Sequence, residues 1–475
     1  MTRYAAPGAR IIASAAMTLG APQALAATDA ASTFTGAGLS LLWTAPFAGL
    51  LLSLALWPIF DADFWHHHYG KISAAWALTL LIPFAIVFGL AATVHQLMHA
   101  LLLEYLPFVI LLLALYTISG GIAVRGTLVG TPKLNTALLA VGAMLASAMG
   151  TTGAAMLLIR PLLRANETRK QRGHIVVFFI ILVGNLGGAL TPLGDPPLFI
   201  GFLNGVEFFW TMRSLALPTL LMSAALLAIF YVIDSRLWRR EPPPPPAVYE
   251  PLAIDGSVNF TLIAGVVAAV LLSGVWKPGI SFDIAGTPLE LQNLVREIAL
   301  AVLAILSLAL TPRVVRDNNA FTWEPIAEVA KLFAGIFITI IPSIAMLQAG
   351  SAGPLARVVE LVTESASGEP RHVMYFWITG LLSAFLDNAP TYLVFFNLAG
   401  GDPSALMGPL RRTLVAISAG AVYFGSLTYV GNAPNFMIKA IAEQRGVRMP
   451  GFFAYLAYAS VLLLPLFVII SVVNA

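Results

Sequence analysis

A succession of apolar segments, each about 20 residues long, is the feature of this sequence that most restricts its fold. A helix needs about 20 apolar residues to cross a hydrocarbon core of ~30 Å. Only 10% of the 475 residues are charged, against roughly 25% in a soluble domain, so most of the surface must face lipid. We therefore expect an all-α polytopic membrane protein, with segments near 40–60, 74–92, 106–124, 136–164, 173–203, 213–234, 258–275, 297–312, 331–349, 373–398, 411–442 and 453–473.

The N-terminus and the middle of the chain differ from these segments. Residues 1–26 are typical of a secretory signal peptide, with Arg3 and Arg10 before a short apolar core and a small-residue cleavage site at Ala24 to Ala26. The alternative is an uncleaved leader. Residues 239–256 contain five consecutive prolines, which cannot form a helix. We expect a semi-rigid linker between two transmembrane halves, 27–238 and 257–475.

Two segments of the first half contain helix-breaking residues. Residues 136–164 contain Ser147-Ala-Met-Gly-Thr-Thr-Gly153, which predicts a re-entrant hairpin. Residues 173–203 contain Thr191-Pro-Leu-Gly-Asp-Pro-Pro197, which predicts a broken helix. In lipid, each freed backbone group is costly, so such breaks persist only where they are buried in protein or line a cavity.

The second half repeats this design. Gly188 to Pro197 align with Gly425 to Pro434 at an offset of 237, with five of ten positions identical, and Ser147-Ala148 align with Ser383-Ala384 at an offset of 236. The second match pairs Thr151-Thr152-Gly153 with Asp387-Asn388-Ala389. We therefore expect two repeats, each of about five transmembrane helices plus a re-entrant hairpin and a broken helix.

The distribution of charge predicts how the repeats are oriented. An odd number of crossings in each repeat turns the second repeat upside down. If the mature N-terminus is outside the cytosol, Lys and Arg divide 17 to 7 in favour of the cytosolic side, as the positive-inside rule requires. We expect inverted repeats in the inner membrane, a cytosolic linker, and both mature termini outside the cytosol.

Four breaks should meet near the middle of the bilayer, where paired broken helices form the substrate site of secondary transporters. Two of them carry a carboxylate, Asp195 and Asp387. An ionisable residue at membrane depth is expensive, so a functional role is the default interpretation. The alternative is that each aspartate only caps a half-helix, and this alternative is most serious for Asp195, which two prolines follow.

The neighbours of the two carboxylates suit a hard cation, which prefers oxygen ligands. Burial favours the protonated form of a carboxyl group, so one site could hold either a proton or Na⁺ (or Li⁺). We expect Asp387 to be the main carrier and Asp195 the second. Asn185 could line the pathway or join two helices by a hydrogen bond. The expected ligands or hairpin-locking residues are Thr151, Thr152, Thr191, Gly194, Asn388, Thr428, Gly431, Asn432 and Asn435.

Two histidine clusters are weaker candidates. His66 to His68 could sense pH or bind a metal, but an interfacial collar with neighbouring aromatic residues is the favoured interpretation. His95 and His99 have the spacing of a zinc pair without its general-base glutamate, which favours a short amphipathic helix outside the membrane.

The transport motifs resemble a known family. Gly187 to Pro197, Leu386 to Pro390 and Gly431 to Asn435 are similar to the ion transporter superfamily, and within it to the group labelled sodium/proton antiporter or putative citrate transporter. The resemblance implies a scaffold domain, a transport domain with two opposed hairpins, homodimers and elevator-like motion. Divalent-anion/sodium symporters of the superfamily typically have Ser-Asn-Thr at the hairpin tips. The Asp387-Asn388-Ala-Pro390 tip is instead similar to the antiporter branch.

The sequence thus favours a Na⁺(Li⁺)/H⁺ antiporter with an alternating-access site. We expect no enzyme activity and no cofactor, because no nucleophile–base pair is recognisable, and no basic stripe indicates nucleic-acid binding. A cation-coupled citrate or dicarboxylate transporter is the alternative. It is disfavoured because Arg160, nine residues from Thr151, would lie roughly 13 Å away in a helix. A membrane sensor or assembly protein that does not transport is a third hypothesis.

Overall fold

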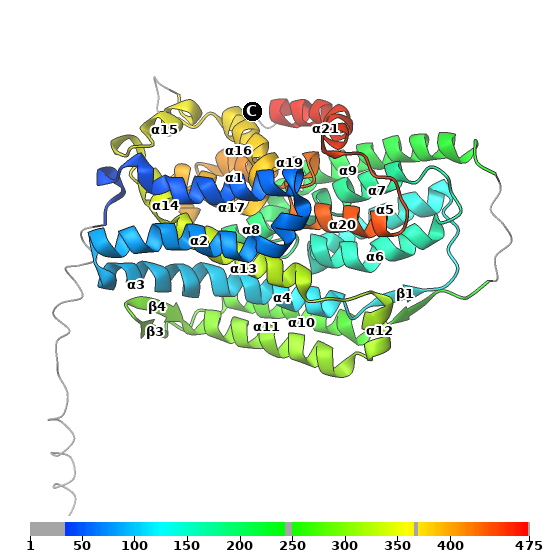
Figure 1. Ribbon diagram of the computed structural model, residues 1–475, viewed down its shortest axis with the longest axis horizontal. Coiled ribbons are helices and arrows are strands. Elements are labelled where there is room, and N and C mark those ends of the chain that lie inside the picture. Colours follow the sequence, from blue (N-terminus) through cyan, green and yellow to red (C-terminus); the bar gives the residue numbers. More distant parts are fainter. Residues whose placement is uncertain (1–33, 243–248, 365–368, 474–475) are drawn as a thin grey trace, which may run out of the picture.

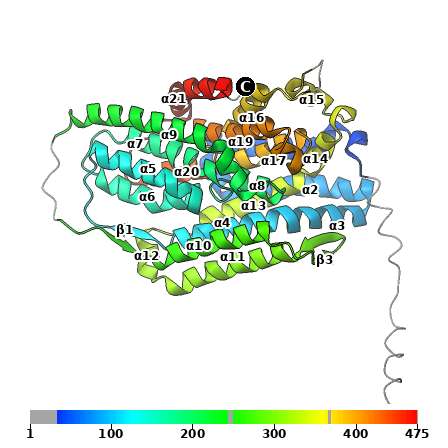
Figure 2. The same ribbon diagram turned by 180° about the vertical axis from the view of Figure 1, so that it is seen from behind.

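Helices that run roughly along the long axis of the molecule build almost all of the structure (Figures 1 and 2). The computed structural model describes residues 34–242, 249–364 and 369–473, so the expected signal peptide and most of the proline run lie outside the described residues. Within the described part, eight segments are long and apolar enough to cross a membrane, or nine if one bent pair counts as a span. The chain is therefore a multi-pass membrane protein.

Seven of the eight spans lie at the periphery. In the most apolar window of each, 22–44% of residues are buried, whereas the value for Gly173–Leu190 is 83%. That segment therefore lies inside the protein, and the others expose apolar faces that suit lipid. The peripheral helices are α1 (Ala45–Phe60), α2 (Ala62–Phe88), α3 (Leu90–His99), α4 (Leu106–Ser119), α9 (Phe208–Trp238), α10 (Val258–Val275), α11 (Leu291–Leu310) and α21 (Phe452–Val473).

The first half contains the predicted hairpin and broken helix. Helices α5 (Pro132–Met149) and α6 (Thr151–Ala165) meet at Gly150, whose φ of 80° is readily adopted only by glycine. Helix α7 (Gly173–Leu182) gives way to the 3-10 turn η4 (Leu186–Leu190), and α8 (Pro196–Leu203) begins after it. Pro196 suits the first position of α8, because its missing N–H has no intrahelical partner there.

The second half contains the corresponding elements in the same order. Helices α16 (His372–Leu386) and α17 (Asn388–Leu398) meet at Asp387. Helix α19 (Arg411–Phe424) ends at the 3-10 turn η6 (Gly425–Leu427), and α20 (Ala433–Gln444) follows. The order matches the expected duplication, while the opposite orientation of the halves stays a prediction.

Two peripheral segments differ from the sequence prediction. Helices α3 and α4 are joined by the π-helical segment η3 (Ala100–Tyr105) into one span, Leu90–Ser119. The short helix predicted around His95 is present as α3, but it continues through η3 into α4 instead of ending as a separate element. Helices α13 (Glu324–Thr339) and α14 (Ile341–Gln348) are bent by 44°, where a continuous segment was predicted. Pro342 explains the bend, because proline removes a backbone donor and clashes with the preceding turn.

Helix α2 begins ahead of the predicted start at residue 74, so His66 to His68 lie in its first turns. His66 Nε2 lies 3.0 Å from Glu324 Oε1 of α13, and the ring of His68 stacks on Phe64. These contacts place the cluster in a helix–helix junction with aromatic neighbours.

Short strands also occur where none was predicted. Strand β1 (Ala123–Arg125) pairs antiparallel with β2 (Ala253–Asp255), so the ends of the predicted 106–124 span and 239–256 linker form a two-stranded sheet. Arg125 Nη2 donates to Asp255 Oδ1 over 2.6 Å, and this bond holds the pKa of Asp255 below its ordinary value. The other short elements are β3 (Ser281–Ile284), β4 (Thr287–Glu290), η1 (Gly36–Gly38), η2 (Leu41–Thr44), η5 (Gly350–Ala352), α12 (Arg313–Asn318), α15 (Ala356–Val362) and α18 (Pro403–Met407).

Candidate functional site

Asp195 is the centre of a buried polar cluster to which four chain segments contribute. Its side chain precedes α8 and is 1% exposed. Asn388, the first residue of α17, donates to Oδ2 over 2.6 Å, and Asn432, ahead of α20, donates to Oδ1 over 2.8 Å. Thr151, the first residue of α6, donates to Oδ1 over 3.3 Å. The two hairpin tips and the two helix breaks therefore meet at one carboxylate, as the sequence predicted.

A second layer of amides joins the two broken helices. Asn185 Nδ2 donates to Asn435 Oδ1 over 2.8 Å, and Asn185 Oδ1 accepts from Asn432 Nδ2 over 3.2 Å. Asn435 donates in turn to the carbonyl oxygens of Gly425 and Thr428. Asn185 thus makes a helix–helix hydrogen bond, which was one of its two predicted roles. Asn432 links Asn185 to Asp195, because it donates to both residues.

Thr191 and Thr428 lock each hairpin to its broken helix. The Thr191 hydroxyl donates to the carbonyl oxygen of Ser147, and the Thr428 hydroxyl donates to that of Ala384. These contacts match at an offset of 237, and Gly150 and Asp387 are the turn residues at the same offset. The hairpin alignment predicted from Ser147-Ala148, at an offset of 236, was therefore wrong by one residue, because a two-residue match was too short to fix it.

Glycine is required at the equivalent positions of the two breaks. A Cβ atom on Gly194 would lie 2.1 Å from the carbonyl oxygen of Gly188, and one on Gly431 would lie 2.7 Å from that of Gly425. The Thr151 N–H donates to the Gly194 carbonyl over 2.9 Å. The glycines therefore let the backbone of each break fold closely on itself, and in the first half the Thr151 bond joins that break to the hairpin tip.

Asp387 has a different role from Asp195. It is 8% exposed, and its Oδ1 accepts from the Ala389 N–H over 3.2 Å, which caps α17. Its φ of 77° is strained for a non-glycine residue. Asp195 precedes α8 but makes no capping bond. Asp387 therefore caps its half-helix and Asp195 does not. The sequence had instead made capping the more serious alternative for Asp195.

The amide oxygen of Asn388 stands out within the cluster. Asn388 is fully buried, and its Oδ1 has no hydrogen-bond partner among the described residues. Orphaned buried polar atoms are rare and call for an explanation such as an ion. No arginine or lysine side chain hydrogen-bonds to Asp195 or Asn388 in the described part. Thr152, one of the predicted site residues, makes no side-chain hydrogen bond in the described part. The structure therefore does not connect Thr152 to the Asp195 cluster.

The histidine candidates do not form a metal centre. Among the residues that the structure describes, no group of three or more His, Asp or Glu side chains could hold a metal ion.

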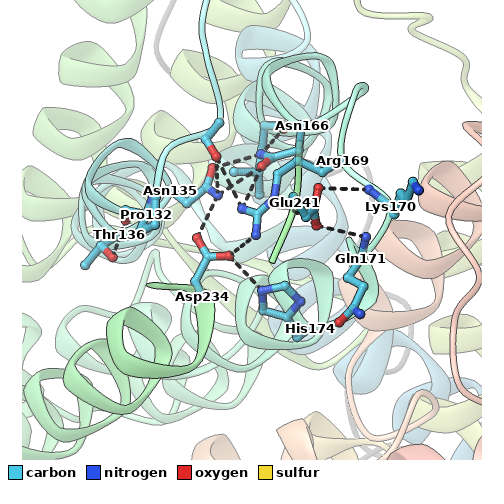
Figure 3. Close-up of polar contacts among 12 residues, drawn as sticks. Pro132, Asn135, Thr136, Asn166, Arg169, Lys170, Gln171, His174, Asp234 and Glu241 are labelled. Atoms are coloured by element: carbon cyan, nitrogen blue, oxygen red, sulfur yellow. Dashed lines mark hydrogen bonds and ion pairs between the residues drawn. The ribbon is translucent and has the colours of Figure 1, made fainter. Parts of the chain in front are cut away.

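A second buried polar cluster was not predicted from the sequence (Figure 3). Asp234 of α9 is fully buried and pairs with Arg169 over 2.6 Å and with His174 of α7 over 2.8 Å. Asn135 of α5 donates to its other oxygen over 3.0 Å. A single aspartate inside an otherwise apolar helix was the signal that could have indicated it.

Comparison with known proteins agrees with these observations. A family model described as "Putative citrate transport" matches residues 36–474, a range that contains both hairpins and both breaks. No curated protein gives a significant match to the chain.

Proposed function

We propose which species this chain transports, starting from the finding that the chain belongs to the putative citrate transport family. The chain is a multi-pass membrane transporter. We propose that the Asp195 site carries Na⁺ (or Li⁺) in exchange for protons. Homodimers, elevator-like motion and an inner-membrane location with positive-inside orientation belong to the same proposal.

One observation carries this proposal. Asn388 donates a 2.6 Å hydrogen bond to the Asp195 carboxylate where the two halves meet. The other amide atom of Asn388, Oδ1, has no hydrogen-bond partner in the described part. A carboxylate and neutral amide oxygens suit a small hard cation. The side chains that donate to Asp195 in the described part of the chain are neutral, so either a proton or a metal cation can neutralise the carboxylate, and competition for it couples the two fluxes.

The exchange follows from the position of Asn388. Its Nδ2 donates to Asp195 Oδ2, and a cation held by the Asp195 carboxylate would bind Asn388 through Oδ1 in place of that contact. Asn388 belongs to the hairpin tip, so occupancy of the site changes the bonds between hairpin and broken helix. Asp387, adjacent to Asn388, holds the tip by its cap and is the second acidic group of the site.

Proteoliposomes with an internal ΔpH dye test this function. Addition of Na⁺ or Li⁺, but not of an impermeant control cation, should dissipate a preformed ΔpH in wild type. Asp195→Asn and Asp387→Asn should abolish or strongly reduce the response. If both variants respond as wild type does, the assignment of the site is wrong.

Cation-coupled citrate or dicarboxylate transport is the second candidate, and two observations favour it. The family model carries the description of citrate transport. Arg160 of α6 also has a buried Nη1 without a hydrogen-bond partner in the described part, although it lies roughly 13 Å along the helix from Thr151. Labelled citrate uptake into the same proteoliposomes separates the candidates: Na⁺-dependent uptake without ΔpH dissipation would favour this one.

A further inference from the structure

A cavity of about 310 Å³ lies between the start of α5 and the end of α9, away from the Asp195 site. It is lined by Thr131, Lys133, Tyr231, Ser235, Trp238 and Arg239, together with Pro132. Its volume is at the lower end of ~300–1,000 Å³, the usual range for ligand pockets. Two cations, three hydroxyl groups and two aromatic rings thus surround a space that fits a small anionic group.

The second polar cluster (Figure 3) joins the two helices that line the cavity, α5 and α9. Asn135 of α5 is bonded to Asp234 of α9, so the two helices are fixed to each other beside the cavity. The Arg169 guanidinium carbon lies 5.3 Å from the centre of the Trp238 ring. The side of the cavity that carries Trp238 is therefore held in place.

The acidic groups of this region are engaged on the inner side. Asp234 pairs with Arg169 and His174, and Glu241 accepts from the backbone N–H groups of Lys170 and Gln171. Lys133 and Arg239 form no ion pair in the described part of the chain, and both are exposed. The cavity consequently carries an excess of positive charge.

The backbone of α5 adds to this charge. The Thr131 hydroxyl caps α5 by accepting from the Leu134 N–H over 3.3 Å, and Pro132 has no N–H. The Lys133 N–H has no intrahelical acceptor, because it lies in the first turn. Helix N-termini favour anions, and phosphate above all.

Two exposed apolar stripes continue from the cavity along the helices. On α5, Val141 is 43% and Met144 is 67% exposed, and on α9 Leu221 is 61% exposed. Ala224 and Ala228 of α9 are exposed as well. A free inorganic anion would not use these stripes, whereas acyl chains would cover them. Basic pockets between transmembrane helices are typical sites for lipid headgroups.

We propose that this cavity binds the headgroup of an anionic phospholipid, with the phosphate between Lys133 and Arg239 and the acyl chains along α5 and α9. Tyr231 and Trp238 suit the interfacial depth at which such a headgroup lies. Because α5 is the outer arm of the hairpin that reaches Asp195, a bound lipid would support the base of that hairpin.

Native mass spectrometry of the purified full-length protein tests the proposal by titration with phosphatidylglycerol and with phosphatidylcholine. Wild type should bind phosphatidylglycerol more tightly, and the double variant Lys133→Gln/Arg239→Gln should weaken that binding by on the order of tenfold or more. The matched control, Arg236→Gln/Arg240→Gln, removes the same charge from exposed arginines outside the cavity and should bind as wild type does. Equal losses in the two double variants would overturn the proposal, since they would show unspecific attraction.

Two further experiments distinguish a lipid phosphate from a soluble anion, and a loss of binding from misfolding of a variant. Inorganic phosphate and the water-soluble headgroup glycerophosphoglycerol should not compete with the lipid at millimolar concentration. Competition by either would show a soluble-anion site and overturn the lipid proposal. The lipid-free melting temperature of both double variants should equal that of wild type, because the substituted side chains are exposed. If only the cavity variant melts lower, the single variant Lys133→Arg should keep selective binding, and its failure to do so would overturn the proposal.

Discussion

In the first half the hairpin turns at Gly150 and the broken helix carries Asp195, whereas in the second half the hairpin turns at Asp387 and the broken helix carries Asn432. The backbone contacts around these residues are equivalent. Thr191 and Thr428 lock their hairpins through the same bond, and a glycine allows the same close approach in each break.

The difference lies in where each half carries its charge. One carboxylate stands at the centre with amide groups from the other half around it, and the second stands at a hairpin tip and caps a helix. Two carboxylates facing each other at the centre would repel, and one of them would have to be protonated. The shared backbone therefore builds the pocket, while the differing side chains place one carboxylate at its centre and the other at its edge.

Exchanging the central residues should have the largest effect. Asp195→Asn should lower Na⁺-driven ΔpH dissipation by on the order of 100-fold, because losing an interaction with a charged group of ~3 kcal/mol corresponds to that factor. The double variant Asp195→Asn/Asn432→Asp should recover part of the activity, since residue 432 places a carboxylate in the same pocket. No recovery in a well-folded double variant would show that the two positions are not interchangeable and would limit the comparison to the backbone.

The two hairpin tips should contribute unequally to the site. Asn388→Ala removes the unpartnered oxygen that would hold the cation, and should weaken the apparent Na⁺ affinity about tenfold or more. Thr151→Ala removes a 3.3 Å bond and should weaken it only about threefold. Concentration dependence of the ΔpH response measures both. An equal effect of the two substitutions would contradict the asymmetry.

The turn residues should differ in stability. Gly150→Ala puts a Cβ on a residue whose positive φ and extended ψ suit glycine, and should lower the free energy of unfolding by ~1–3 kcal/mol. Asp387→Gly relieves the same strain but removes the cap, so the melting temperature should change little while transport falls. Asp387→Asn keeps a capping side chain and removes only the charge. A large stability loss in Asp387→Asn would mean that the carboxylate is structural.

The hairpin locks should have the smallest effects, and these should be equal. Thr191→Val and Thr428→Val each remove one buried hydrogen bond and should cost about 1 kcal/mol. Thermal unfolding in detergent would measure both, with each single Thr→Ser variant as a control that retains the hydroxyl. If one lock costs several times more than the other, the equivalence of the two backbones fails.

Local signals in the sequence predicted much of this site. Gly150, Gly194 and the prolines after Asp195 mark breaks that no apolar helix tolerates, and the duplication showed that the breaks come in pairs. The identity of the contacts could not be predicted, because Asn388 and Asp195 meet only after both halves have folded together. The capping role of Asp387 could not be predicted either. The alignment at an offset of 236 placed the hairpin turn one residue away from Asp387.

The features that the sequence did not predict arise from long-range packing. Asp234 lies on α9 and Arg169 in the loop between α6 and α7, and the packing of α5, α7 and α9 brings the cluster together. The sequence did not show that the short helix around His95 would continue through η3 into α4 as one span. Hydropathy measures how apolar a segment is, but it does not register how neighbouring helices bend or join it.

Binding of Na⁺ to the purified protein, measured with ²²Na⁺ at alkaline pH, tests most directly whether Asp195 is the centre of the cation site. Wild type should bind Na⁺ saturably and lose this binding as the pH falls, while Asp195→Asn should show no saturable binding with an unchanged melting temperature. Saturable binding of wild-type affinity in the Asp195→Asn variant would contradict the account.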